Sequence, residues 1–172
     1  LVDGGTKLTQ LNYSMDKVEL QAENLRKMFL AMAKDIRVIL IKLADRLHNC
    51  RTIEFMPEHK RDKILSETMF VFIPLAHRLG LYSIKSEMED IWLRFKEPEA
   101  YNEISAKINR NISDKDKQIN EFIAPIEESL KKSGFSFEVK KRVKTPYSIW
   151  HKMQTKGISF EQIYDLYAVR II

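Results

Sequence analysis

Apolar residues recur at intervals of three and four over most of the first 130 positions, which is the period of an α-helix with one buried face. The strongest pattern covers residues 36–49, and Asp35 stands where it can cap this helix. Prolines and glycines divide the rest of the helical pattern. The sequence therefore predicts further helices over residues 18–32, from Pro57 to Leu79 with a kink at Pro74, over residues 83–95, and from Pro98 to Lys132 with a bend near Pro125.

The period of the pattern changes in the last 40 residues. Residues 135–139 alternate between apolar and polar types, and residues 166–172 are rich in strand-forming types, so both favour β-strands. Between them, residues 145–153 predict a short helix with Thr145 as its cap and Pro146 at its first position. The expected fold class is mainly α: a helical region followed by the opening strand, helix and strand of an α+β region.

Composition narrows the class of protein. The chain has 172 residues, of which 44% are hydrophobic and 31% charged, which is enough apolar material for a core and excludes a wholly disordered chain. The longest apolar stretch, residues 69–76, is too short to span a bilayer, and a single cysteine, Cys50, excludes an internal disulfide framework and suits a reducing cytoplasm. The chain does not begin with Met, and a strand pattern reaches its last residue, so we expect a piece of a longer chain. Four aromatic residues at core-like spacing are expected to be buried: Phe70, Phe72, Trp92 and Phe95.

The net charge is +5, with a sequence pI near 9.2, and the excess of basic residues lies between Glu138 and Lys156. Such a balance favours an anionic partner without naming it. On charge alone, the chain can be a basic helical module that binds RNA or an acidic protein.

Asp45 and Asn49 lie four positions apart in the strongest helix pattern, so their oxygen-bearing side chains share one face. A divalent cation accepts a carboxylate oxygen, while an amide and a nearby arginine can hold the phosphate that the cation polarises. The same spacing also fits a solvated helix end in which Asp45 pairs with Arg46 or Lys42.

A second candidate site lies in the basic segment. Arg142 and Lys144 are two apart on a strand-like segment, Ser148 and Lys152 are one turn apart on the next helix, and Asp165 follows. These residues can surround a polyphosphate, and a carboxylate beside a triphosphate suggests magnesium. The alternative is a solvated basic face with Asp165 as a turn or cap residue.

Four collinear segments resemble the RelA/SpoT family of (p)ppGpp synthetase/hydrolases: residues 41–52, 74–80, 142–153 and 160–170. The resemblance covers nearly the whole chain. It implies that residues 1–96 are the C-terminal part of a helical HD hydrolase domain, residues 97–133 a helical connection, and residues 134–172 the N-terminal part of a truncated synthetase domain.

For the hydrolase, the resemblance implies removal of the 3′-pyrophosphate of ppGpp and pppGpp with the help of a manganese ion. Asp45 then corresponds to a metal ligand, and Asn49, Arg51 and Thr52 to residues that line the substrate pocket. The family's other metal ligands precede the segment that matches this chain. We therefore expect these 172 residues, on their own, not to hydrolyse (p)ppGpp measurably.

For the synthetase, the resemblance implies a pyrophosphokinase that moves pyrophosphate from ATP to GDP or GTP. Arg142, Lys144, Ser148 and Lys152 then correspond to residues that hold the phosphates of ATP, and Asp165 to the first magnesium ligand. The family's remaining ligand follows the matched segment, so synthesis by this chain alone should also fail. The resemblance further implies a cytoplasmic bacterial enzyme of the stringent response, with any ribosome association through parts outside this chain.

Overall fold

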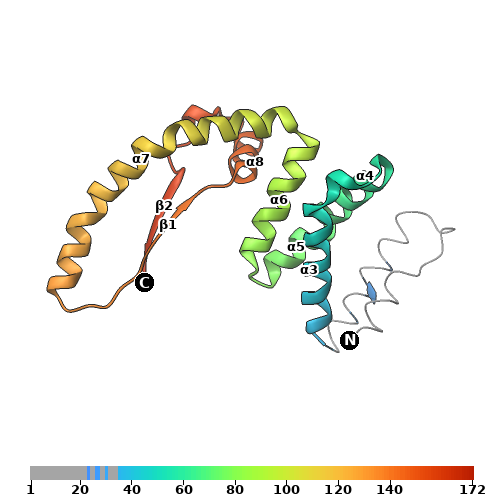
Figure 1. Ribbon diagram of the computed structural model, residues 1–172, viewed down its shortest axis with the longest axis horizontal. Coiled ribbons are helices and arrows are strands. Elements are labelled where there is room, and N and C mark those ends of the chain that lie inside the picture. Colours follow the sequence, from blue (N-terminus) through green and yellow to red (C-terminus); the bar gives the residue numbers. More distant parts are fainter. Residues whose placement is uncertain (1–22, 24–25, 28–29, 31–34) are drawn as a thin grey trace. The chain divides into compact units, whose positions relative to one another are not determined.

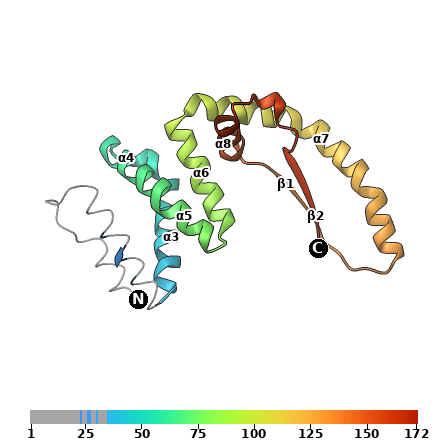
Figure 2. The same cartoon turned by 180° about the vertical axis from the view of Figure 1, so that it is seen from behind.

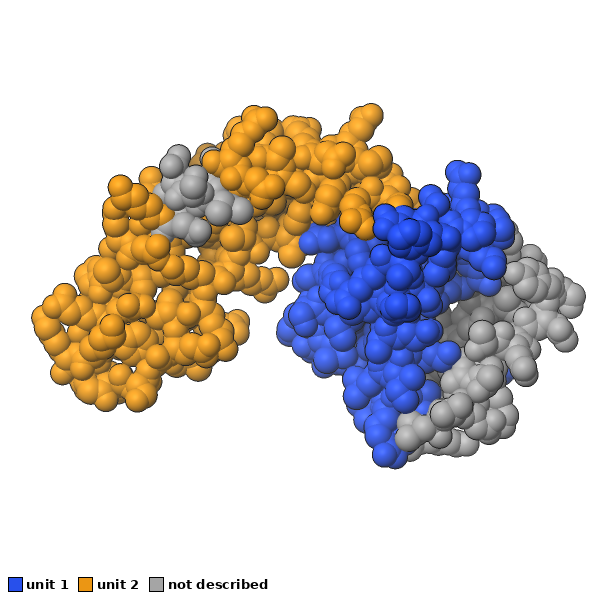
Figure 3. All heavy atoms as spheres, in the orientation of Figure 1, with its two compact units in different colours: residues 1–92 blue, residues 93–172 orange. Residues whose placement is uncertain are grey.

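The computed structural model describes residues 23, 26, 27, 30 and 35–172, including their side chains except at residues 111–116. The helix predicted over residues 18–32 lies largely outside this part. The chain divides into two compact units, residues 1–92 and residues 93–172, shown in different colours in Figure 3. The three-part division predicted from the sequence stays a prediction. Within the described residues, no helix is both long enough and apolar enough to cross a bilayer.

The described part of the first unit, from residue 35 onward, is built from helices (Figure 1). In chain order these are α3 (Arg37–Arg51), the 3₁₀ turn η1 (Ile53–Phe55), α4 (Glu58–Glu67), the π-helical turn η2 (Thr68–Phe72), α5 (Ile73–Arg78) and α6 (Tyr82–Lys96), which runs into the second unit. The strongest sequence pattern is confirmed as α3. Its buried face consists of Val38, Ile39, Leu43, Leu47 and Cys50.

Both ends of α3 have polar contacts. The Asp35 side chain accepts a hydrogen bond from the backbone N of Arg37 through Oδ1 at 3.0 Å, although the capping position itself is Ile36. Near the other end, the buried Cys50 Sγ hydrogen-bonds with Thr68 Oγ1 at 3.4 Å. This contact ties α3 to the π-helical turn.

Where the sequence predicts a kink at Pro74, the structure has a π-helical turn just before this proline. Proline has no N–H, and its ring clashes with the carbonyl four residues earlier, so a wider turn accommodates it. The wider turn also changes which side chains face inward. Thr68 is fully buried, whereas Phe70 is 76% exposed, so the prediction that Phe70 is a core residue was wrong. A spacing rule based on the regular α-helix fails across a turn of this kind.

In the second unit, α7 (Pro98–Lys132) is a single long helix that contains Pro125 and curves along its length (Figure 1). The stop predicted at Gly134 is confirmed. The Gly134 N–H donates to the Lys131 carbonyl at 3.0 Å, and the Phe135 N–H donates to the Leu130 carbonyl at 3.1 Å. Gly134 has φ of 77°, a conformation that residues with a side chain rarely adopt, so this glycine ends the helix.

After α7 come β1 (Val139–Val143), α8 (Pro146–Lys156), the 3₁₀ turn η3 (Phe160–Gln162) and β2 (Tyr167–Ile171). The two strands form an antiparallel pair in which Val139 lies opposite Ile171 and Val143 opposite Tyr167. The first strand begins later than the alternating pattern predicts, because that pattern starts in the loop after α7. The mainly α fold class with an opening strand, helix and strand is confirmed.

The core of the second unit joins α7 to α8 and to η3. Figure 2 shows α8 beside the first part of α7, and the two helices are in contact. The buried side chains of this core are Ile104, Ile108, Ile149, Phe160 and Ile163. They fix the position of α8, on which two candidate site residues stand.

Candidate functional site

On α3, Asp45 and Asn49 share one face, since four helical positions differ by about 40° around the axis. Asp45 is exposed and Asn49 is half-buried. Among the described residues, no ion pair or hydrogen bond engages either side chain. The arrangement leaves a carboxylate and an amide open to a ligand on one side of the helix.

Arg46 turns away from Asp45. Its Nη2 donates to Glu67 Oε2 at 2.6 Å, and its guanidinium lies 4.3 Å from the centre of the Phe72 ring. The Arg46 side chain is only 13% exposed. The pair with Asp45 that the sequence left open is therefore not formed, and Arg46 connects α3 to α4 and to the π-helical turn.

Arg51 is held by α6. Its Nε and Nη2 donate to the two oxygens of Glu87 at 2.5 and 2.9 Å, and this hydrogen bonding lowers the pKa of Glu87 and raises the pKa of Arg51. Around the helix, Arg51 lies about 120° from Asp45. Thr52 ends α3, and its Oγ1 donates to the His48 carbonyl at 3.0 Å. The structure thus brings Asp45, Asn49 and Thr52 to one side and turns Arg51 to another.

An exposed carboxylate oxygen such as that of Asp45 suits a divalent cation, so this residue fits a metal as one ligand. A bound cation needs several ligands. Within the part of the chain that the structure describes, no group of three or more His, Cys, Asp or Glu side chains could hold a metal ion. Asp45 therefore contributes to a metal site only together with other ligands.

The second candidate site is a compact charged cluster, which we call the Lys–Asp–Lys cluster: Lys144, Lys152 and Asp165. Lys152 Nζ donates to Asp165 Oδ1 at 2.6 Å, and Lys144 Nζ donates to Asp165 Oδ2. These two hydrogen bonds hold the pKa of Asp165 well below its ordinary value, and the bond from Lys144 contributes most. The grouping predicted from the sequence is therefore present for these three residues.

Local structure explains why the cluster forms. Lys144 directly follows β1, and its backbone N–H donates to the Leu166 carbonyl at 2.8 Å, which brings Asp165 alongside. Lys152 comes from α8, which begins where Thr145 Oγ1 accepts a hydrogen bond from the Ser148 backbone N at 3.3 Å. This cap confirms the prediction for Thr145.

The other two predicted phosphate residues lie next to the cluster without contacting it. Ser148 stands one turn before Lys152 on α8, and its Oγ is 3.0 Å from Thr145 Oγ1. Arg142 is exposed on β1, opposite Ala168 and two residues before Lys144. Residues two apart on a strand point to the same face, so Arg142 extends the basic surface beside the cluster.

Lys107 on α7 contacts the turn that precedes Asp165, and the sequence pattern does not single this residue out. Its Nζ pairs with Glu161 Oε1 and Glu103 Oε1, each at 2.9 Å, and lies 5.3 Å from the centre of the Phe160 ring. These contacts fasten the η3 turn, which leads to Asp165, onto α7. Glu103 and Lys107 have the spacing of a helical ion pair, but no periodic signal connects Lys107 with Glu161, 54 positions away.

Comparison with known proteins identifies the two regions. An HD domain family matches residues 1–82, and the family described as a region found in RelA / SpoT proteins matches residues 141–172. The chain therefore joins HD-domain sequence to a RelA/SpoT region, each containing one of the candidate sites.

Curated relatives match the whole chain. A GTP pyrophosphokinase of Myxococcus xanthus is 45% identical over 174 residues, and a guanosine-3′,5′-bis(diphosphate) 3′-pyrophosphohydrolase of Aquifex aeolicus is 42% identical over 173 residues. A probable enzyme of the latter kind from Synechocystis is 43% identical. The chain belongs to the RelA/SpoT family. It spans about a quarter of the length of these relatives, 23% of the first and 24% of the second.

These relatives are named as enzymes, one group for hydrolysis and one for pyrophosphate transfer, and this family is one in which divalent metal ions are expected. Nothing in the comparisons favours the alternative of a basic module for RNA or an acidic protein.

Proposed function

We propose that this chain supplies part of two active sites, one that removes the 3′-pyrophosphate of (p)ppGpp and one that transfers pyrophosphate from ATP to GDP or GTP. The observation that carries the proposal is the convergence of Lys144 and Lys152 on Asp165 within the region that matches RelA/SpoT proteins. Two ammonium groups and a carboxylate at one point are suited to a metal-bound polyphosphate.

In the hydrolytic site, Asp45 would be one ligand of a manganese ion, and Asn49 and Thr52 would line the pocket for the guanine nucleotide. When bound, the cation screens phosphate charge and acidifies a water molecule. Arg51 belongs to the same proposal. Its guanidinium is held in place by Glu87, so it would meet the substrate as a fixed group at the end of α3.

In the synthetic site, Arg142, Lys144, Ser148 and Lys152 would hold the triphosphate of ATP, and Asp165 would be a ligand of magnesium. Arginine supplies a planar fork of donors and lysine a compact charge, so the set suits successive phosphates. We also propose a cytoplasmic location, which the lone buried Cys50 suits, and place any ribosome association in parts of the protein outside these residues.

The test separates the two sites in full-length enzymes. The 172 residues replace the matching segment of the Myxococcus xanthus relative for the synthetic assay and of the Aquifex aeolicus relative for the hydrolytic assay. We expect Asp165→Asn to reduce synthesis, and Asp45→Asn to reduce hydrolysis, by more than the about 10- to 100-fold typical of an outer-shell metal partner. Each substitution should leave the other activity unchanged.

Two exposed acids provide matched controls for loss of one negative charge: Glu58→Gln on α4 and Glu128→Gln on α7. Both variants should retain both activities. The proposal is contradicted if Asp45→Asn and Asp165→Asn leave their respective reactions intact, or if each lowers both reactions equally.

A further inference from the structure

Arg51 uses only one side of its guanidinium to bind Glu87. Its Nε donates to Glu87 Oε1 at 2.5 Å, and its Nη2 donates to Glu87 Oε2 at 2.9 Å. A guanidinium carries five N–H groups in a planar fork, so three remain: two on Nη1 and one on Nη2. Arg51 has no further partner among the described residues. The three remaining donors are therefore available to a second oxyanion, on the side of the guanidinium that faces away from Glu87.

The pair of Arg51 and Glu87 is both accessible and fixed in direction. The side chain of Arg51 is 57% exposed and that of Glu87 is 39% exposed, so a ligand can approach the free donors. Arg51 is the last residue of α3, and Glu87 lies on α6 of the same unit. A bidentate pair has a defined geometry, so Glu87 decides where the free donors of Arg51 point.

Arg51 stands away from Asp45 along α3 as well as around it. Six helical positions correspond to a rise of about 9 Å along the helix axis. Thr52, which follows Arg51, lies on the same side of α3 as Asp45. A ligand that lies along this side from Asp45 to Thr52 therefore ends close to Arg51. The proposed substrate ppGpp has two diphosphate groups on one ribose, and hydrolysis removes only the 3′ group.

We propose that Glu87 is a positioning residue of the hydrolytic site: it holds Arg51 so that the free donors of Arg51 bind the 5′-diphosphate, the group that is not cleaved. This inference rests on the proposed hydrolytic function and deepens it, because it assigns the two diphosphates of the substrate to two separate points of α3. The 3′ group lies at Asp45, and the 5′ group lies at Arg51.

The role of Glu87 follows from the cost of ordering a long side chain. An arginine that is already held by a carboxylate loses less conformational entropy when a phosphate binds than a freely moving one does. The 5′-diphosphate is remote from the bond that breaks, so its contact with Arg51 is equally strong in the ground state and in the transition state. Such a contact lowers KM and leaves kcat unchanged.

The experiment uses the full-length Aquifex aeolicus relative with its matching segment replaced by these 172 residues. It measures kcat and KM for ppGpp and for an analogue that has a 5′-monophosphate in place of the 5′-diphosphate. We expect the unchanged chimera to favour ppGpp by about tenfold or more in kcat/KM, through KM, which is the size of a hydrogen bond between charged groups. Calorimetry in EDTA measures Kd for both compounds without cleavage and should show the same preference.

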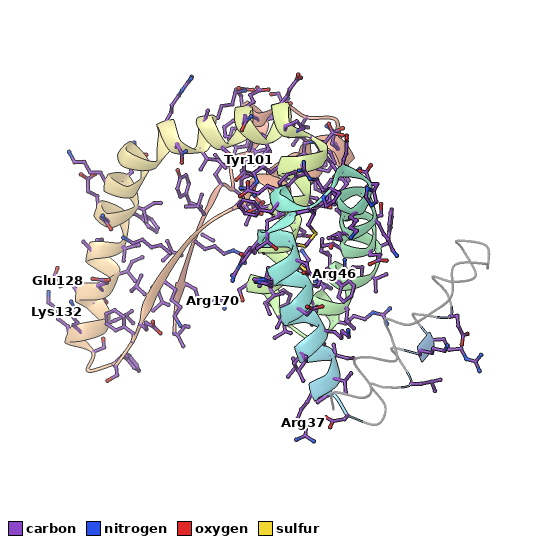
Figure 4. The ribbon with its side chains drawn as sticks, turned by 45° about the vertical axis from the view of Figure 1, so that its right-hand side comes forward. Arg37, Arg46, Tyr101, Glu128, Lys132 and Arg170 are labelled. Atoms are coloured by element: carbon purple, nitrogen blue, oxygen red, sulfur yellow. The ribbon has the colours of Figure 1, made fainter. Side chains whose placement is uncertain are left out.

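Three variants test the part played by the pair. Arg51→Met should abolish the preference for ppGpp, and Glu87→Gln should reduce it by about threefold or more while kcat for ppGpp stays unchanged. Glu87→Asp keeps the charge and should retain part of the preference. The preference is a ratio within one variant, so it does not depend on how much of that variant is folded. Glu128→Gln is the matched control, because Glu128 pairs with Lys132 in the last turns of α7 (Figure 4) and should keep the full preference.

The inference is overturned if the unchanged chimera does not distinguish the two compounds, or if the preference survives Glu87→Gln or Arg51→Met. It is also overturned if Glu87→Gln lowers KM for ppGpp, since Glu87 would then only neutralise Arg51. Failure of the proposed function gives a different result, namely hydrolysis that is unaffected by Asp45→Asn. Hydrolysis that depends on Asp45, together with a preference that does not depend on Glu87, removes this inference alone.

Discussion

The two candidate sites distribute their charges in opposite ways. On α3, the arginines are engaged, since Arg46 pairs with Glu67 and Arg51 with Glu87, while the Asp45 carboxylate has no ion-pair partner among the described residues. In the Lys–Asp–Lys cluster, the carboxylate is engaged by both lysines. The first site therefore presents a free anionic group, and the second presents a small net positive charge.

The residue types at a site therefore do not by themselves decide the charge that the site presents to a ligand. The pairing of those residues with their neighbours decides it as well. Both candidate sites contain basic groups and one carboxylate, but the acids supplied by neighbouring elements neutralise the basic groups only on α3. Glu67 thereby holds Arg46 away from Asp45, whose carboxylate has no ion-pair partner among the described residues. No corresponding acid neutralises Lys144 and Lys152 except Asp165 itself, as far as the described residues show.

The substitution with the largest expected effect, Ile149→Ala, tests whether the two candidate sites depend on separate cores. Ile149 is fully buried between Ser148 and Lys152 on α8, so Ile149→Ala should destabilise the second unit by about 2–5 kcal/mol. Thermal unfolding measures the loss, and NMR signals of Asn49 should not change below the transition. Ile172→Ala, at a residue that is 62% exposed, is the control and should stay within about 0.5 kcal/mol. Equal perturbation of Asn49 and Lys152 signals would contradict independence.

A smaller effect is expected for Arg46→Ala. This change removes a charged hydrogen bond and leaves Glu67 without its main partner, which should cost about 2 kcal/mol of stability in the first unit. Denaturant unfolding measures it, with Lys60→Ala on the exposed side of α4 as the control. If stability hardly changes in this variant, the pair between Arg46 and Glu67 does not hold the two helices together. The claim that the arginines of the first site are engaged by neighbouring acids would then be wrong.

The smallest effect concerns the start of α3, where Figure 4 shows Arg37 at the first turn. The hydrogen bond from the Arg37 side chain, more than any other cause, lowers the pKa of Asp35 from 3.8 to about 2. Because the folded-state pKa is below the unfolded one, the carboxylate stabilises the fold above about pH 4, and this contribution is lost as the pH falls through about 2. The difference in melting temperature between the unchanged chain and Asp35→Asn should therefore disappear at low pH. A difference that persists well below pH 2 would show that Asp35 acts through its shape rather than its charge.

Much of the fold could be predicted because local rules act over a few residues. The helical period gave α3 and α6, Pro98 and Gly134 gave the limits of α7, and Thr145 gave the start of α8. The face of Phe70 could not be predicted, because a π-helical turn shifts the phase of the helix and arises from packing as well as from Pro74.

The candidate sites were predictable in their residue types but not in their pairing. The resemblance singled out Lys144, Lys152 and Asp165, and the structure brings them into contact. Spacing along the chain could not reveal that Glu87 holds Arg51, because the two residues come from different helices and only tertiary structure brings them together.

The hydrogen bond between Cys50 and Thr68 has a practical consequence for the first unit. The thiol is fully enclosed, and burial, the largest cause, raises its pKa, so little of the reactive thiolate is present while the unit is closed. These 172 residues contain one cysteine, so a thiol-specific reagent can label them only after α3 separates from the π-helical turn. The rate at which Cys50 is labelled therefore reports how often this part of the first unit opens, and no engineered probe is needed.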